Sequence, residues 1–151
     1  MSRPNPEQLG PPSVSLGAFQ LWVHGREFPK AKDRWDGNWL NVTAHCGGDG
    51  ASVWASGAIL DTVGLRRFRD ELTWLQQTLA GKAVLASLEP YVGVLVKAVD
   101  ITGRLLMEVN ITPDPTCQSH HFEFEVDPGL LPATIAQLES LLDTYPVRGM
   151  K

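Results

Sequence analysis

Residues 62–80 read TVGLRRFRDELTWLQQTLA, and this stretch has the clearest apolar spacing in the chain. Its apolar side chains recur every three or four residues, which is the spacing of one face of an α-helix. They are Leu65, Phe68, Leu72, Leu75 and Leu79. Asp61 and Thr62 can cap the start of this helix, and Gly81 can end it in a left-handed conformation. The sequence therefore predicts an amphipathic helix that must lay its apolar face on another layer of the fold.

The chain on both sides of this helix reads as short β-strands separated by turns. Seven strands are expected, at residues 19–28, 40–46, 51–60, 83–88, 91–99, 104–112 and 121–126. A second amphipathic helix is expected after Pro128. Its apolar face would carry Leu131, Ile135, Leu138, Leu142 and Tyr145. Most strands are joined by short turns, which antiparallel pairing permits. We therefore predict the α+β class, with a single antiparallel β-sheet of about seven strands and two amphipathic helices packed on one face.

The length of 151 residues fits one domain. Four prolines among polar residues open the chain, so we expect residues 1–14 to form a flexible N-terminal segment and residues 15–151 a single α+β domain. The chain has no apolar run of membrane-spanning length, and its start lacks the hydrophobic middle of a signal peptide. Cys46 and Cys117 are the only cysteines, and we expect free thiols in a reducing compartment. These features predict a cytoplasmic protein without a membrane partner.

The charge pattern argues against binding of nucleic acid. The formal net charge is −4, whereas a general nucleic-acid binder gathers basic residues on one face. Arg66, Arg67 and Arg69 form a basic cluster, but Asp70 and Glu71 stand beside them, which is typical of a solvated helix face.

Two sets of residues could in principle carry catalysis. His45 and Cys46, with the Cys117–His121 stretch, contain zinc-ligand types, but adjacent residues of a strand point to opposite faces and neither cysteine lies in a recognisable nucleophile motif. Glu108, Glu123 and Glu125 could act as acid and base, yet they alternate with core residues, as a half-exposed sheet requires. We therefore expect no catalytic residue, no metal and no cofactor.

The stretch WDGNW, residues 35–39, is predicted to be structural. Asp36, Gly37 and Asn38 supply turn chemistry, and Trp35 and Trp39 on either side would clamp the turn to the sheet. Trp22 and Trp54 fall on the outward sides of their strands, where they could pack at an edge or take part in an interface.

Three blocks of the chain resemble the WapI-type bacterial immunity proteins, the antidotes encoded beside polymorphic toxins. They are WDGNWLNV (35–42), LRRFRDELTWLQQTLAGKA (65–83) and FEFEVDPGLLPATIAQLESLLDTYPVRG (122–149), and the resemblance spans about residues 18–149. It implies a non-catalytic protein that neutralises a cognate toxin C-terminal domain, such as a basic nuclease, by direct binding. A structural or adaptor module and a zinc- or thiol-dependent enzyme remain the alternatives.

An acidic row marks the expected contact surface for such a partner. Glu108, His121, Glu123 and Glu125 should lie on the sheet face that the helices leave bare. Like charges set side by side are unfavourable for folding, and a cationic partner would offset their repulsion. We predict these four residues as partner-binding.

Overall fold

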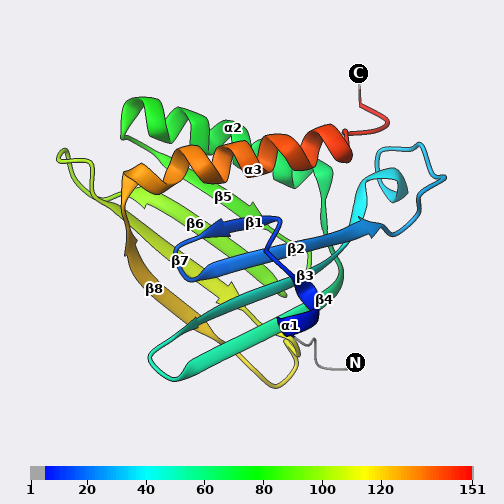
Figure 1. The fold of residues 1–151 in the computed structure, drawn as a ribbon, viewed down its shortest axis with the longest axis horizontal. Helices are drawn as coiled ribbons and strands as arrows, with labels where there is room; N and C mark the ends of the chain where they lie inside the picture. The colour runs from blue at the N-terminus through cyan, green and yellow to red at the C-terminus, as the bar shows by residue number, and fades with distance from the viewer. Residues whose placement is uncertain (1–5, 151) are drawn as a thin grey trace.

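The computed structural model describes residues 6–150, which contain three helices and eight strands (Figure 1). The helices are α1 (Pro6–Leu9), α2 (Thr62–Thr78) and α3 (Leu131–Thr144). The strands are β1 (Val14–Leu16), β2 (Phe19–Arg26), β3 (Trp39–Gly48), β4 (Ala51–Asp61), β5 (Lys82–Ala86), β6 (Val92–Ala98), β7 (Leu105–Ile111) and β8 (His121–Val126). Short 3-10 turns, η1 (Asp36–Asn38) and η2 (Pro128–Leu130), precede β3 and α3. No helix in the described range is both long and apolar enough to cross a bilayer.

The strands form two antiparallel sheets, sheet A in the order β1-β2-β3-β4 and sheet B in the order β5-β6-β7-β8. The predicted α+β class with antiparallel strands is confirmed, and α2 and α3 lie side by side on the same side of the strands (Figure 1). The structure divides the expected single sheet of about seven strands into two sheets of four and adds β1. The division falls at α2, because this helix carries the chain away from β4 before β5 begins. β4 and β5 therefore remain as edge strands of their own sheets.

One hydrophobic core joins both sheets and both long helices. On α2, Leu65, Phe68, Leu72 and Leu75 are buried, as the spacing predicts. Leu79 differs, because it adopts a left-handed conformation with φ of 51° after the last helical residue and is 39% exposed. The helix ends before the predicted Gly81, since the Ala80 N–H donates to Thr78 Oγ1 instead of continuing the helix.

The second predicted apolar face is only partly buried. On α3, Leu131, Ile135 and Leu138 enter the core, whereas Leu142 and Tyr145 are half-buried. Leu141, which the spacing does not include, is buried as well. On β7, every second residue faces the core, as expected, and these are Leu105, Met107, Val109 and Ile111. The outward side of sheet B is therefore made by the residues between them.

The N-terminal segment touches sheet A where it is described. Residues 1–5 of the predicted flexible segment 1–14 lie outside the described residues. Further along, the Gly10 carbonyl accepts a hydrogen bond from Trp22 Nε1 at 3.0 Å, and Ser13 Oγ accepts one from the Val23 N–H at 3.0 Å. Residues 10–13 thus run beside β2 before β1 begins at Val14.

The WDGNW stretch folds around Asn38 rather than around its tryptophans. Asn38 is fully buried, its Nδ2 donates to the carbonyls of Arg34 and Arg148, and its Oδ1 accepts from Thr62 Oγ1 and the Arg148 N–H. One side chain therefore ties together the loop before β3, the first turn of α2 and the C-terminal segment. Trp39 is half-buried. Trp35 is 58% exposed, and the Cζ atom of Arg34 lies 4.5 Å from the centroid of its ring.

Candidate functional site

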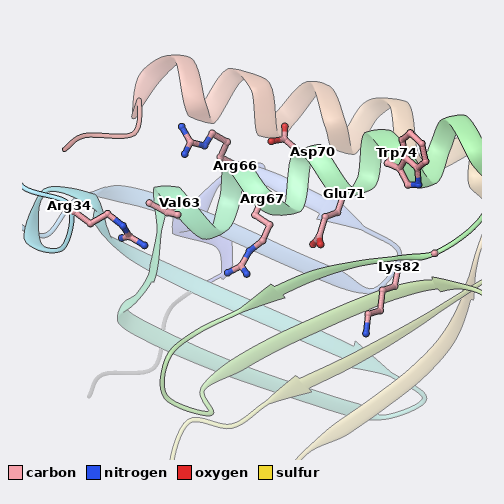
Figure 2. A pocket seen from close by; sticks show the side chains of 9 residues that line it. Arg34, Val63, Arg66, Arg67, Asp70, Glu71, Trp74 and Lys82 are labelled. Carbon is pink, nitrogen blue, oxygen red and sulfur yellow. The ribbon is translucent and has the colours of Figure 1, made fainter. Parts of the chain in front are cut away.

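A groove of about 710 Å³ runs beside α2, and its walls carry charged and aromatic side chains (Figure 2). They come from the loop before β3, from the outward side of α2 and from the start of β5, and they are Arg34, Val63, Arg66, Arg67, Asp70, Glu71, Trp74, Gly81 and Lys82. This lining contains no cysteine, histidine, serine or threonine that could act as a nucleophile. Arginine and tryptophan are enriched at surfaces that bind other proteins.

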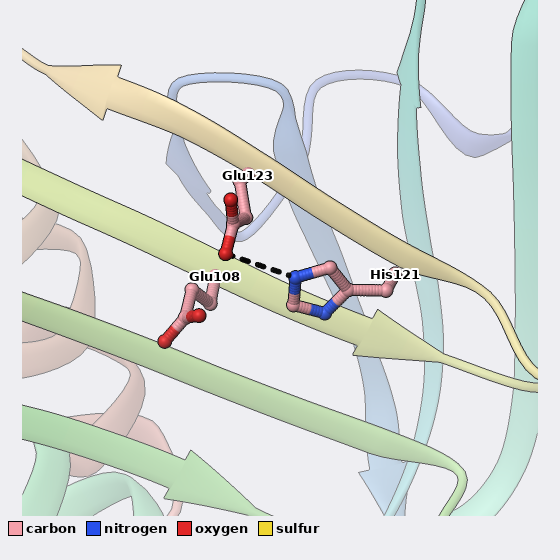
Figure 3. A group of neighbouring side chains, drawn as sticks. All are labelled: Glu108, His121 and Glu123. Carbon is pink, nitrogen blue, oxygen red and sulfur yellow. Dashed lines mark ion pairs between the residues drawn. The ribbon is translucent and has the colours of Figure 1, made fainter.

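The predicted partner-binding residues lie together on the outward side of sheet B. β7 pairs with β8 so that Glu108 stands opposite Glu123, and His121 and Glu125 follow on the same side of β8. Figure 3 shows Glu108, His121 and Glu123 converging, with an ion-pair distance of 3.3 Å from His121 Nε2 to Glu123 Oε1. Glu125 is at the other end of the strand. We call these four residues the acidic row.

Basic side chains neutralise part of the acidic row. Lys97 on β6 lies 3.7 Å from Glu108, and Arg104 pairs with Glu125 and lies 3.6 Å from Asp100. Glu123 is 54% exposed and has no lysine or arginine partner among the described residues, so it holds the most available negative charge. The sequence pattern does not single out these cations, because strand register decides which residue stands opposite which.

Glu108, His121 and Glu123 also have ligand types that bind metals. One ligand atom from each lies within 4.8 Å of the others, and this is the one such group of three found among the described residues. Hydrogen bonding to Glu108, followed by that to His121, lowers the pKa of Glu123. His121 Nδ1 is 2.9 Å from Asn110 Oδ1, and Lys97 stands beside Glu108, so these groups already satisfy one another. The candidates for zinc in the sequence were His45 and Cys46 with the Cys117–His121 stretch, so His121 is the one residue common to both sets.

The two thiols lie in different environments. Cys46 is in the core, where burial raises its pKa to about 11. Cys117 is exposed in the loop before β8, and its pKa is raised, chiefly by a hydrogen bond to the Asp114 carboxylate. A nucleophilic or metal-binding cysteine needs the opposite shift, because the thiolate is the reactive species.

The outward side of sheet A carries a layer of aromatic and polar side chains. Trp22 and Trp54 stack with ring centroids 5.6 Å apart, and His45 lies 4.2 Å from Trp54. His45 hydrogen-bonds to Gln20 at 3.1 Å and to Ser52 at 2.7 Å, and burial lowers its pKa. His45 and Cys46 thus point to opposite faces of β3, and the ring nitrogens of His45 are already engaged.

A protein-family model described as the immunity protein WapI-like family matches residues 13–146. The matched region begins just before β1 and ends just after α3, so it covers both sheets and both long helices. No curated protein matches the chain.

Proposed function

The chain belongs to the WapI-like immunity protein family, and we propose that it neutralises a bacterial toxin by binding the toxin's C-terminal domain directly. The family match over residues 13–146 is the observation that carries this proposal. Such a protein acts by covering its partner, one molecule for one, in the cytoplasm of the cell that makes both. It needs no cofactor.

The chemistry of the described side chains supports binding over catalysis. The pKa values of Cys46 and Cys117 are both raised, which keeps these thiols protonated near neutral pH. The groove beside α2 is lined by four basic side chains and one tryptophan, together with two carboxylates. Arginine and tryptophan are residue types that contribute strongly to binding of a protein partner.

We place the toxin contact on the acidic row of Glu108, His121, Glu123 and Glu125. Exposed carboxylates on a rigid sheet attract a basic domain such as a nuclease, and they speed its association at low salt. Glu123 should contribute most to this attraction, because Lys97 partly neutralises Glu108 and Arg104 partly neutralises Glu125.

The first experiment tests for a complex and for its nature. The purified chain is titrated with the toxin domain encoded beside it, by calorimetry, and the dissociated toxin is then assayed. We expect one-to-one binding and full recovery of toxin activity after dissociation. A toxin that stays inactive after separation would indicate enzymatic modification, and a lack of any complex would favour the adaptor alternative.

The second experiment tests the contact surface by charge reversal. The double variant Glu123→Lys with Glu125→Lys should slow association about tenfold at low salt and reduce its salt dependence, because rim charges act mainly on the association rate. The matched control is Glu139→Lys with Asp143→Lys, which makes the same charge change at exposed positions of α3. Equal association rates for the two folded double variants would place the contact elsewhere.

A further inference from the structure

The groove beside α2 carries positive charge that the described part of the chain does not neutralise. Figure 2 shows Arg67 and Lys82 below α2, and Arg34 reaching toward them from the loop before β3. Among the side chains of residues 8–150, no carboxylate oxygen lies within 4.0 Å of the charged nitrogen atoms of these three residues. The result is a local excess of cations in a chain whose formal net charge is −4.

The two acids of the groove are engaged with other groups. Asp70 pairs with Arg69 at 2.8 Å, and Glu71 Oε1 accepts a hydrogen bond from the Val84 N–H of β5 at 3.0 Å. Glu71 thereby satisfies one backbone donor on the open edge of sheet B. Neither carboxylate forms an ion pair with Arg34, Arg67 or Lys82, so the excess positive charge remains available to a ligand.

Arg34 supplies the most specific sign of a missing partner. Its Nη1 atom is shielded from solvent yet has no hydrogen-bond acceptor among the described residues. An unsatisfied buried donor costs about 1–3 kcal/mol, and more when it is charged. The guanidinium is also held in place over the Trp35 ring at 4.5 Å. An oxygen atom of a ligand that reached Nη1 would satisfy this donor.

The groove continues between the edges of the two sheets. A second hollow shares Arg34, Val63 and Arg67 with it. The end of β4 also lines this hollow, as do the last residue of β5 and the two residues that follow, 86–88. Exposed apolar side chains border the combined groove, with Trp35 at 58%, Trp74 at 62% and Leu88 at 72% exposure. Exposed tryptophan together with arginine is the composition that dominates binding energy at protein interfaces.

We propose that this groove binds an extended peptide segment of a protein partner, in which carboxylate side chains alternate with apolar ones. The carboxylates would pair with Arg34, Arg67 and Lys82, and arginine can hold a carboxylate through two parallel hydrogen bonds. The apolar side chains would lie against Trp35, Trp74 and Leu88. A nucleic acid fits less well, because its continuous negative charge would also meet Asp61, Asp70 and Glu71 along the walls.

This proposal goes beyond the proposed function, because it concerns a second surface of opposite charge. It does not require that the segment come from the toxin. The groove and the acidic row belong to different elements, α2 with β5 and β7 with β8, so each can be altered without touching the other.

The test uses the full chain and a short fluorescein-labelled peptide in which glutamate and leucine alternate. Fluorescence anisotropy should show saturable binding that weakens with salt. A peptide with glutamine in place of glutamate, and a labelled single-stranded oligonucleotide, should each bind at least tenfold more weakly. The proposal is overturned if the wild-type chain shows no saturable binding of the acidic peptide, or if it binds the oligonucleotide more tightly than the peptide.

Two variants locate the binding. Arg34→Gln with Arg67→Gln should weaken peptide binding about tenfold or more. The matched control is Lys30→Gln with Lys32→Gln, which also removes two charges, at exposed positions outside the groove lining, and should leave binding unchanged. Equal loss in both variants would mean non-specific charge attraction and would overturn the proposal. Melting temperatures check that the variants fold. Toxin binding, measured separately, should survive the groove substitutions, so a failure here is distinguishable from a failure of the proposed function.

Discussion

Asn38 shows how one buried polar residue can organise distant parts of a chain. Its amide makes four hydrogen bonds, to Arg34, Thr62 and, through two groups, Arg148. Buried polar groups are tolerated when all their partners are present, and they become costly when one partner is removed. The stability of the loop before β3 therefore depends on Asn38 more than on the exposed ring of Trp35.

We predict that Asn38→Ala lowers the free energy of unfolding by about 2–4 kcal/mol, because it leaves several buried partners unsatisfied. Trp35→Ala should cost no more than about 1 kcal/mol, since it removes an exposed ring and one cation–π contact. Urea unfolding of both variants measures the difference. A greater loss for Trp35→Ala would show that the tryptophan clamps the turn after all, as the sequence pattern first suggests.

The sequence predicts a structural role for this stretch and emphasises its tryptophans, whereas the buried polar side chain in it is Asn38. Arg34 is a local partner of Asn38, but its other two partners, Thr62 and Arg148, lie 24 and 110 residues away in the chain. Long-range hydrogen bonds of this kind leave no local pattern. The same reason hides the ion pair of Lys97 with Glu108. The register of sheet B sets Glu108 opposite Leu95, so Lys97 reaches it from a diagonal position on β6.

Among the elements, α2 is the one that sequence predicts best. Its apolar spacing and its N-terminal cap are local signals, and the structure confirms four of the five predicted core residues. Asp61 Oδ1 accepts a hydrogen bond from the Gly64 N–H at 2.7 Å, which satisfies one of the free donors at the start of the helix. The division into two sheets could not be predicted in this way, because strand patterns do not reveal that β4 and β5 do not pair with each other.

The cap leads to a prediction for the element as a whole. Asp61→Ala should lower the free energy of unfolding by about 1 kcal/mol, whereas Asp61→Asn should keep most of it, because an amide oxygen can accept the same hydrogen bond. Urea unfolding of both variants distinguishes a cap from a simple charge effect. Equal losses for alanine and asparagine would mean that the carboxylate charge, and not the hydrogen bond, is what matters.

At the scale of the whole molecule, charge is distributed unevenly over the fold. The acidic row lies on sheet B, and the basic groove follows α2 and β5, so the formal net charge of −4 hides two surfaces of opposite sign. A partner that engaged both surfaces would have to carry a matching pair of opposite charges. This arrangement restricts the choice of partner more than a uniformly acidic surface would.

Titratable groups whose pKa values are shifted in the folded chain determine how its stability depends on pH. Burial lowers the pKa of His45, so below its ordinary value of about 6.5 the unfolded chain takes up a proton that the folded chain resists. Hydrogen bonds lower the pKa values of Asp33, Asp100 and Asp114 in the same direction, at more acidic pH. Burial raises the pKa of Cys46 from 9.0 to about 11, so in alkali the unfolded chain loses a proton that the folded chain keeps.

We therefore predict that the free energy of unfolding is greatest between about pH 7 and pH 9 and falls on both sides. The acidic decline should begin near pH 6.5 and steepen below about pH 4.5, where the carboxylates titrate. The alkaline decline should run from about pH 9 to pH 11, as Cys46 ionises in the unfolded chain.

Urea unfolding midpoints measured from about pH 4 to pH 11 test this profile. His45→Gln should flatten the step near pH 6 and Cys46→Ala the alkaline step, each without altering the other. An alkaline decline that persists unchanged in Cys46→Ala would assign it to other groups and refute the role given to the buried thiol.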